Sequence, residues 1–260
     1  MSEIFERVVC GVDHSEAGNV AAQLASRLTL PEGSLALVSV DDPSLAVHAG
    51  FEAAAVTAEL LREAEAALVK GRTAAEPSHA VETCLLEGNP LDCLLAEIER
   101  EEATLAVVGS HGYSRAVGIP LGSVATHLLH EAPCSVLVAR APRDAERWPH
   151  TIVAGVDGSP ESAPAAEVAR ELAERFGAAV RFVAATADRV DIEAAREIAP
   201  GLEEVPERAV EELHVLSELA DLVVVGSRGL KGIRALGSVS ERVAHEALCS
   251  VLVVRPGRET

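Results

Sequence analysis

One pattern of glycines and apolar runs occurs twice in this 260-residue chain, and it constrains the fold more than any other feature. The first copy reads Gly-Ser-His-Gly at 109–112 and then Gly-Ser-Val at 122–124, and the second reads Gly-Ser-Arg-Gly at 226–229 and then Gly-Ser-Val at 237–239. Each copy follows an apolar run and precedes a predicted helix, a Cys-Ser step and a second apolar run. Backbone N–H groups in a glycine loop between a strand and a helix N-terminus are suited to holding phosphate.

The similarity extends upstream, because Val-Asp-His-Ser at 12–15 matches Val-Asp-Gly-Ser at 156–159. The second half has lost roughly 27 residues between its first strand and its first glycine, and about two more inside the glycine loop. This pattern indicates duplication of a whole domain with an eroded second copy, and not a short-period solenoid. The expected domains are residues 1–141 and 150–260, joined by a charged linker that contains proline.

The composition excludes several classes of protein. A formal net charge of −19 opposes binding to nucleic acid or to an acidic membrane surface. The chain has no apolar run of about 18 residues that would indicate a membrane-spanning helix, and its start lacks a signal-peptide pattern. Its five cysteines are odd in number and include no CxxC motif, which fits a reduced, cytoplasmic protein.

The periodicity of apolar residues predicts alternating strands and helices in both halves. In the first half, strands are expected at 7–12, 34–40, 80–86, 104–108 and 135–140, and helices at 16–28, 51–72, 90–102 and 124–131. In the second half, the expected elements include strands at 151–156 and 180–184, helices at 161–176 and 192–198, and an extended segment at 202–205. Strands separated by helices imply an α/β fold, in which a parallel open sheet carries helices on both faces.

Ligands of such sheets bind outside the carboxyl ends of the strands. Asp13, Val40 and Gly109 end the first, second and fourth predicted strands, so they are expected to converge on one crevice. Asp13 and its counterpart Asp157 also fit a simpler role as helix N-cap or turn residues. The chain contains neither GxxxxGK[ST] nor GxGxxG, which rules out the usual P-loop and dinucleotide fingerprints.

Together, the glycine spacing, the Val-Asp-x-Ser segment and the Cys-Ser-Val-Leu-Val strand resemble the universal stress protein family in tandem form. The resemblance implies two domains, each with five strands in the order 3-2-1-4-5, the second one shortened. It also implies binding of ATP or AMP, with or without Mg²⁺, and dimers formed through the last strand. Strands 135–140 and 250–255 would then pair as an intramolecular pseudo-dimer, which would cover two sheet edges. A homodimer of whole chains and an unknown protein partner remain open.

The resemblance also assigns site residues. In the first half, adenine and ribose would be surrounded by Gly11, Val12, Asp13 and Val40, and ribose and phosphates by Gly109, His111, Gly112, Gly122, Ser123 and Val124. Ala125 stands where Ser or Thr is frequent, so one hydroxyl contact is missing. The matching residues of the second half are Asp157, Gly226, Arg228, Gly229, Gly237, Ser238, Val239 and Ser240. Because the second loop is shorter, nucleotide binding is expected mainly in the first domain.

The sequence leaves three functions to compare. The preferred one is an adenine-nucleotide-binding regulatory module, because the sequence places no nucleophile beside a base and no carboxylate pair for acid–base work. The alternatives are a nucleotide-free interaction protein and a weak ATPase. His130 and His245 are expected near helix C-termini, where the helix dipole favours a cation. No metal site is expected, since Cys249 precedes a buried strand.

Overall fold

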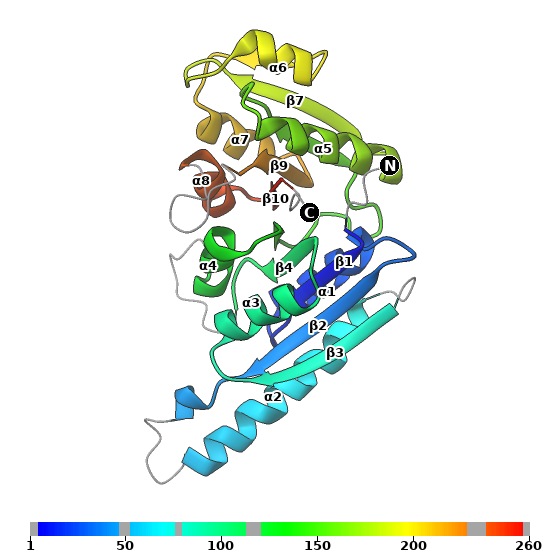
Figure 1. The fold of residues 1–260 in the computed structure, drawn as a ribbon, viewed down its shortest axis with the longest axis vertical. Coiled ribbons are helices and arrows are strands. Elements are labelled where there is room, and N and C mark those ends of the chain that lie inside the picture. The colour runs from blue at the N-terminus through cyan, green and yellow to red at the C-terminus, as the bar shows by residue number, and fades with distance from the viewer. Residues whose placement is uncertain (1–4, 47–52, 76–79, 113–120, 228–237, 257–260) are drawn as a thin grey trace. The chain divides into compact units, whose positions relative to one another are not determined.

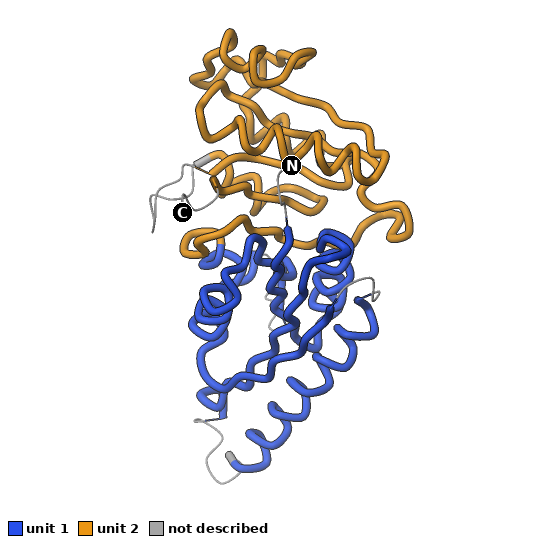
Figure 2. The backbone as a smooth tube through the Cα atoms, turned by 45° about the vertical axis from the view of Figure 1, so that its right-hand side comes forward, with its two compact units in different colours: residues 1–128 blue, residues 129–260 orange. Residues whose placement is uncertain are grey.

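A computed structural model describes residues 5–46, 53–75, 80–112, 121–227 and 238–256. The backbone forms two compact units, residues 1–128 and residues 129–260, which Figure 2 shows in different colours. The first unit holds four strands of the first repeat. The second unit holds the fifth strand of that repeat together with the whole second repeat.

Unit 1 is a parallel sheet with the strand order β3-β2-β1-β4 and helices on both faces (Figure 1). On one face, Leu94 of the third helix reaches Gly11, and on the other, Ala22 and Leu37 lie beside Gly71. Its elements are β1 (Arg7–Gly11), α1 (Glu16–Leu28), β2 (Ser34–Asp41), α2 (Ala53–Ala74), β3 (Ala80–Glu87), α3 (Pro90–Arg100), β4 (Leu105–Gly109) and the start of α4 (Ser123–Glu131).

Local sequence signals set the starts of two of these helices. Ser15 caps α1 by accepting the Gly18 N–H at 3.1 Å. Asn89 caps α3 by accepting from Leu91 N–H at 2.9 Å, and Pro90 occupies the first helical turn. α3 ends at Arg100, two residues earlier than predicted, because Glu102 adopts a left-handed φ of 48°.

Unit 2 has the strand order β5-β10-β9-β6-β7-β8, in which every pair is parallel except β5 with β10. Within the second repeat the order is therefore 3-2-1-4-5, as predicted. The elements are β5 (Ser135–Ala139), β6 (Thr151–Gly155), α5 (Ser162–Phe176), β7 (Ala179–Ala185), α6 (Ile192–Ile198), β8 (Glu203–Val205), α7 (Ala209–Ser217), β9 (Leu222–Gly226), α8 (Ser238–Glu246) and β10 (Ser250–Val254).

The shortening of the second repeat is concentrated in one crossover. α6 has 7 residues and β8 has 3, whereas their counterparts α2 and β3 have 22 and 8. Figure 1 shows α2 as a long helix that continues past the arrowheads of β2 and β3. The erosion predicted from the sequence is therefore real, and it leaves the sheet order intact.

The antiparallel pairing of β5 with β10 confirms the strand pairing predicted from the sequence. Leu137 lies opposite Leu252, its own counterpart in the duplication, so the pairing has a local two-fold axis. The flanking hydrogen bonds are reciprocal, because Arg140 N–H donates to Ser250 Oγ at 3.1 Å and Arg255 N–H donates to Ser135 Oγ at 3.2 Å. The side chains of Arg140 and Arg255 also contact α8 and α4 (Ser123–Glu131), at Ala244 O and Leu129 O. We call β5, β10 and the carboxyl-terminal halves of α4 and α8 the seam.

The cores consist of small aliphatic residues, as the 2% aromatic content requires. Phe5 and Trp148 are buried aromatic exceptions, and the Trp148 indole N–H donates to Asp221 O at 3.0 Å. The Asp221 carboxylate in turn accepts from His150 N–H and Thr151 N–H, each at 2.9 Å. These bonds tie the end of the linker to the start of β6.

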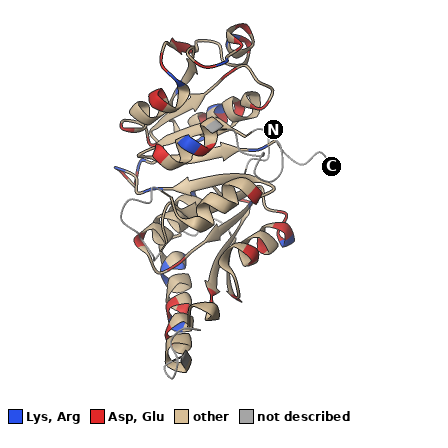
Figure 3. Cartoon of the chain, turned by 90° about the vertical axis from the view of Figure 1, so that its left-hand side faces the viewer, with Lys and Arg blue, Asp and Glu red and all other residues tan. Residues whose placement is uncertain are grey.

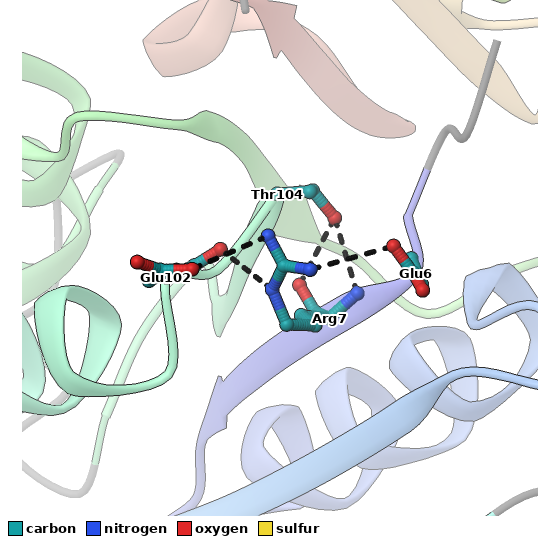
Figure 4. A network of polar contacts seen from close by, with 4 residues as sticks. All are labelled: Glu6, Arg7, Glu102 and Thr104. Carbon is teal, nitrogen blue, oxygen red and sulfur yellow. Dashed lines mark hydrogen bonds and ion pairs between the residues drawn. The ribbon is translucent and has the colours of Figure 1, made fainter. Parts of the chain in front are cut away.

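The equivalent place in unit 1 uses different chemistry, drawn in Figure 4. There Thr104 Oγ1 donates to Arg7 O at 3.0 Å, and Arg7 Nε donates to Glu102 O at 3.0 Å. In both repeats a side chain just before the fourth strand therefore holds the amino end of the first strand. This contact lies at the sheet end opposite to the candidate site.

Charged residues lie mainly on helices and loops of both units, while the strands are largely uncharged (Figure 3). Acidic residues outnumber basic ones, 41 to 22. Within the described ranges, no helix is long and apolar enough to cross a membrane.

Candidate functional site

Asp13 forms a tight turn at the carboxyl end of β1. Its Oδ1 accepts the Ser15 N–H at 3.1 Å and also the Ser15 hydroxyl. Asp157 makes the same turn in the second repeat, where its Oδ1 accepts Ser159 N–H at 3.0 Å and the Ser159 hydroxyl at 2.5 Å. The turn role that the sequence left open is therefore confirmed for both residues, and it fixes where each carboxylate points.

The first glycine segment lies against this turn. A β-carbon added to Gly112 would stand 2.8 Å from Asp13 Oδ2, so the Asp13 carboxylate lies beside the end of the 109–112 segment. Gly109 packs on helix α1, because a β-carbon there would lie 2.9 Å from the carbonyl carbon and oxygen of Ala17. Only glycine permits this approach without moving the helix.

Helix α4 begins directly behind the glycine segment. Gly122 N–H donates to Ser110 O at 2.8 Å, and Gly122 O accepts Thr126 N–H at 3.0 Å, so Gly122 joins the segment to the first helical turn. Residues 123–125 then carry N–H groups that have no acceptor within the helix, together with the positive end of its dipole. Ser123 is exposed and Val124 half-buried, so this helix start is accessible.

Gly122 differs from Gly109 in what surrounds its missing side chain. An added β-carbon would lie 3.6 Å from His111 Cα and 3.7 Å from Gly112 N, which is ordinary contact. Ser110 O also lies 3.6 Å from this position, so a carbonyl oxygen and the Gly112 nitrogen both face it. The N–H groups that can favour an anion here are those at the start of α4, together with the positive end of the helix dipole.

The remaining predicted residues of the first site lie at the carboxyl ends of β1 and β2. Gly11 ends β1, and Val12 N–H donates to Val38 O at 2.8 Å, two residues before Val40. Val40 is half-buried near the end of β2. The structure thus brings Asp13, Gly112 and Gly122 into one neighbourhood and places Val40 at the carboxyl end of the strand next to β1.

Ala125 and its counterpart Ser240 both face inward, with exposed fractions of 2% and 5%. The Ser240 hydroxyl donates to Gly226 O at 2.7 Å and thereby holds the end of β9. At this position the second repeat therefore uses the hydroxyl of Ser240 for a bond to the backbone, and the first repeat, with Ala125, has no such hydroxyl. Val239 is half-buried at the start of α8, and Ser238 begins that helix.

The other residues predicted for the second site divide into two groups. Gly226 packs tightly on helix α5, because an added β-carbon would lie 2.3 Å from Glu161 O. Arg228, Gly229 and Gly237 lie outside the described residues. Ser227, which precedes them, is 1% exposed, and its hydroxyl has no hydrogen-bond partner among the described residues.

The shortened crossover closes on the carboxyl end of β6. Asp191 N–H donates to Asp157 O at 3.0 Å, and a β-carbon at Gly158 would lie 2.2 Å from Asp191 O. Only residues 186–191 separate β7 from α6, whereas residues 42–52 separate β2 from α2. In the second repeat the connection at this end of the sheet is therefore shorter, and Asp191 packs directly on the Asp157 turn.

The sequence reasoning missed His14, which follows Asp13 directly. His14 Nδ1 lies 3.8 Å from Glu63 Oε2 on α2, so it connects the Asp13 turn to the long helix. In the sequence, this position is marked only by a difference between the repeats: the first has His14 where the second has Gly158.

His130 and His245 lie in the last turns of α4 and α8, as expected, but the helix dipole does not decide the charge of His245. The dipole at the end of α8 was expected to favour a charged His245, but the pKa of His245 is lowered, mainly by burial and further by Arg140 and His130. Desolvation therefore outweighs the dipole at this position.

The cysteines behave as small apolar residues. All five are free, and burial raises the pKa of Cys249 to about 12. In the described part of the chain, no cluster of three or more His, Cys, Asp or Glu could hold a metal ion.

Comparison with known proteins agrees with the repeat and with the fold. The model of the universal stress protein family matches residues 4–140 and 202–255. A universal stress protein of Mycolicibacterium smegmatis is 31% identical, covering 96% of this chain and 97% of the relative. Universal stress protein Rv2005c of Mycobacterium tuberculosis is 30% identical over 72% of this chain and 73% of its own length.

Among solved structures, a universal stress protein from Archaeoglobus fulgidus superposes with a TM-score of 0.71 at 19% identity, covering 98% of this chain and 97% of that one. A protein of unknown function from Pseudomonas aeruginosa PAO1 gives a TM-score of 0.67 at 19% identity, with coverage of 98% and 94%. These likenesses support the fold. With the duplicated glycine pattern, the 3-2-1-4-5 sheet order and the family match to both halves, the chain belongs to the universal stress protein family.

Proposed function

We propose that this protein is a regulatory module that binds one adenine nucleotide, ATP or AMP, in its first repeat and does not turn it over. The phosphates would lie at residues 110–112 and the start of α4, and the nucleoside at the carboxyl ends of β1 and β2. Binding would act by favouring one conformation or one partner-binding surface, which requires different affinities for the two states.

The observation that carries this proposal is the environment of Gly122. Its missing side chain faces His111 Cα and Gly112 N at contact distance, next to the unpaired N–H groups of the α4 start. Gly109 and Gly226 are needed for helix packing, whereas Gly122 has no such packing role against the residues that the structure describes. A glycine that packing does not require, at an accessible helix start, is explained by a ligand that approaches the backbone closely.

The proposal includes a preference for the first repeat. In the second repeat, Asp191 lies directly on Asp157 and Gly158, and the connection that precedes α6 is short. A nucleoside at the carboxyl end of β6 would have to displace these contacts. One nucleotide per chain is therefore the expected stoichiometry.

The position of Asp13 also bears on the form of the ligand. Its carboxylate lies beside Gly112, so an unscreened triphosphate would meet a negative charge there. Asp13 is the described carboxylate placed to hold a Mg²⁺, which would supply compensating charge. ATP binding should therefore depend on Mg²⁺ more strongly than AMP binding does.

The test combines calorimetric titration with one variant in each repeat. The wild-type chain should bind about one Mg-ATP or AMP, and Gly122→Val should weaken binding by on the order of 100-fold, because a branched side chain would fill the phosphate position. The matched variant Gly237→Val, at the corresponding position of the second repeat, should leave affinity and stoichiometry unchanged.

The opposite outcomes are equally informative. Loss of binding in Gly237→Val but not in Gly122→Val would assign the site to the second repeat. No binding by the wild-type chain would leave a nucleotide-free interaction protein. Steady release of ADP from Mg-ATP, abolished by Gly122→Val, would show an ATPase and contradict the absence of turnover.

A further inference from the structure

The seam carries a cluster of ionisable side chains that nucleotide binding does not use. His130 lies in the last turn of α4, Arg140 directly follows β5, and Glu241 and His245 lie on α8. His130 Nε2 stands 3.4 Å from Glu241 Oε1, and the His130 side chain is only 17% exposed. These groups join elements that the β5–β10 pairing brings together.

Arg140 is a permanent positive charge within this cluster. Its two terminal nitrogens donate to Ala244 O at 2.6 Å and to Cys249 O at 3.2 Å, so the guanidinium holds the end of α8 and the chain that leads into β10. A guanidinium does not lose its proton near neutral pH. Any proton added nearby therefore has to be accommodated beside an existing cation.

The two histidines are placed unfavourably for carrying charge together. His130 Nδ1 is buried and has no hydrogen-bond partner among the described residues, so a proton on this atom would be a buried donor without an acceptor. His245 is half-buried and interacts electrostatically with Arg140 and His130, and also with Glu241 and Glu246. Glu246 is shared with Arg242, whose Nε lies 3.4 Å away.

The duplication explains why the charges do not balance. His130 and His245 are counterparts in the repeat, but Glu241 corresponds to Thr126, whose hydroxyl donates to Gly122 O at 3.0 Å. The two histidines therefore have one ion-pairing glutamate from this helical position instead of two. With both histidines protonated, three cations (His130, His245 and Arg140) face Glu241 and the shared Glu246.

We propose that this cluster makes the seam a pH-sensitive joint: the β5–β10 pairing is tight while the two histidines are neutral and loosens when both are protonated. The device would respond to acidification of the surroundings. It is independent of the nucleotide site, so it holds whether or not the first repeat binds nucleotide.

The direction of the effect follows from proton linkage. Because the pKa of His245 is lowered in the folded chain, the unfolded chain binds more protons between that value and the ordinary histidine value of about 6.5. The contribution to stability is therefore complete above about pH 6.5 and is lost as the pH falls through the folded value. Glu241 reduces the loss, and Arg140 increases it.

Amide hydrogen exchange on the full-length chain tests the proposal at the strands themselves. Rates are measured for residues 136–138 and 251–253 at about pH 7.5 and about pH 5.5, which span the range where histidine titrates, and are corrected for intrinsic exchange. We expect protection of these amides to fall by on the order of tenfold between the two conditions, within the usual range of coupling between linked sites. Amides in β1 and β2 should change much less.

Substitutions identify the responsible groups. The double variant His130→Asn with His245→Asn should keep its seam protection at the lower pH, whereas Glu241→Gln should lose more protection at the lower pH than the wild type does, because removal of the carboxylate lowers the pKa of His245 further. The matched control His127→Asn changes an exposed histidine of the same helix and should behave like the wild type. An unchanged loss of protection in the double variant would overturn the proposal.

A second measurement covers the case in which the double variant does not fold. Histidine titrations followed by NMR in the wild-type chain should show His245 titrating below the ordinary histidine value of about 6.5. In Glu241→Gln, the pKa of His245 should fall further, since the carboxylate that favours its charged form is gone. Titration of His245 at the ordinary histidine value of about 6.5, unaffected by Glu241→Gln, would also overturn the proposal.

Discussion

The two repeats share a strand order but differ in what surrounds the carboxyl ends of their strands. In the first, a 22-residue helix and an 8-residue strand follow β2, and in the second, a 7-residue helix and a 3-residue strand follow β7. Both keep the turn made by Asp13 or Asp157 and the glycine that lets the first helix pack on the fourth strand. The duplicated packing contacts have thus survived although the crossover of the second repeat has been shortened.

This comparison separates two roles that glycine plays in the repeated motif. Gly109 and Gly226 are required by close approach of a helix, since added β-carbons would lie 2.9 and 2.3 Å from backbone atoms. An added β-carbon at Gly122 would meet only ordinary contacts with described residues, so packing against them does not require a glycine there. A motif can therefore persist in a repeat for packing reasons alone, and its presence there is weak evidence for binding.

The largest expected effect tests the packing role. Gly226→Ala should reduce the free energy of unfolding by about 3 kcal/mol, because the new methyl group would overlap the Glu161 carbonyl, and Gly109→Ala should cost about 1.5 kcal/mol at its longer contact distance. Gly122→Ala is the control and should stay within about 0.5 kcal/mol of the wild type. Urea denaturation measures all three. Equal stability of Gly226→Ala and Gly122→Ala would show that the two glycines do not differ as described.

A smaller effect tests the symmetry of the seam. Arg140→Met would leave the carbonyls of Ala244 and Cys249 without this donor, at a cost of about 2.5 kcal/mol. Arg255→Met should cost about 1 kcal/mol, because Arg255 donates from its side chain to Leu129 O, while its buried Nε has no partner among the described residues.

Thermal and urea unfolding of the two arginine variants, with hydrogen exchange of β5 and β10, would measure this difference. A cost for Arg255→Met equal to that for Arg140→Met would mean that the seam is energetically symmetric. The unequal hydrogen bonds would then not matter for stability.

The smallest expected effect concerns the shortened edge of the second repeat. Arg181 and Glu203 form a bidentate pair between β7 and β8, with distances of 3.0 and 2.7 Å, but both side chains are more than 40% exposed. Glu203→Gln should therefore cost less than about 0.5 kcal/mol. The hydrogen bond to Arg181 lowers the pKa of Glu203, so this contribution is present above about pH 4.3 and is lost as the pH falls below it.

Urea denaturation of the wild type and of Glu203→Gln near pH 7 and near pH 3 checks the sign, because the difference between them should vanish in acid. Added salt should reduce the difference as well. A difference that grew in acid would contradict the assigned direction of the pKa shift.

Much of the fold could be predicted because it depends on local patterns. The apolar runs predicted the strands, and even the remnant helix at 192–198 was recovered with its bounds. The order of the second sheet and the β5–β10 pairing followed from the family resemblance and are confirmed. The pKa of His245 could not be predicted, since it depends on burial and on Arg140, which is distant in sequence.

The candidate site shows the same division. The family resemblance assigned Asp13, Gly112 and Gly122 to one nucleotide site, and the structure places the first two side by side and Gly122 next to Gly112. It could not indicate that Gly109 serves helix packing, that His14 approaches Glu63, or that Ser240 bonds to Gly226 O. Each of these depends on the distance between two elements, which a spacing of residues does not encode.

For this protein the sequence by itself determined the duplication, the alternation of strands and helices, the turn residues and the positions where a glycine loop meets a helix. These follow from periodicity and backbone chemistry, which act over a few residues. Tertiary structure alone decided which glycines serve helix packing, how the short crossover closes on Asp157, and why the pKa of His245 at the seam is lowered. These properties depend on burial and on contacts between distant segments, and only the assembled sheet brings those segments together.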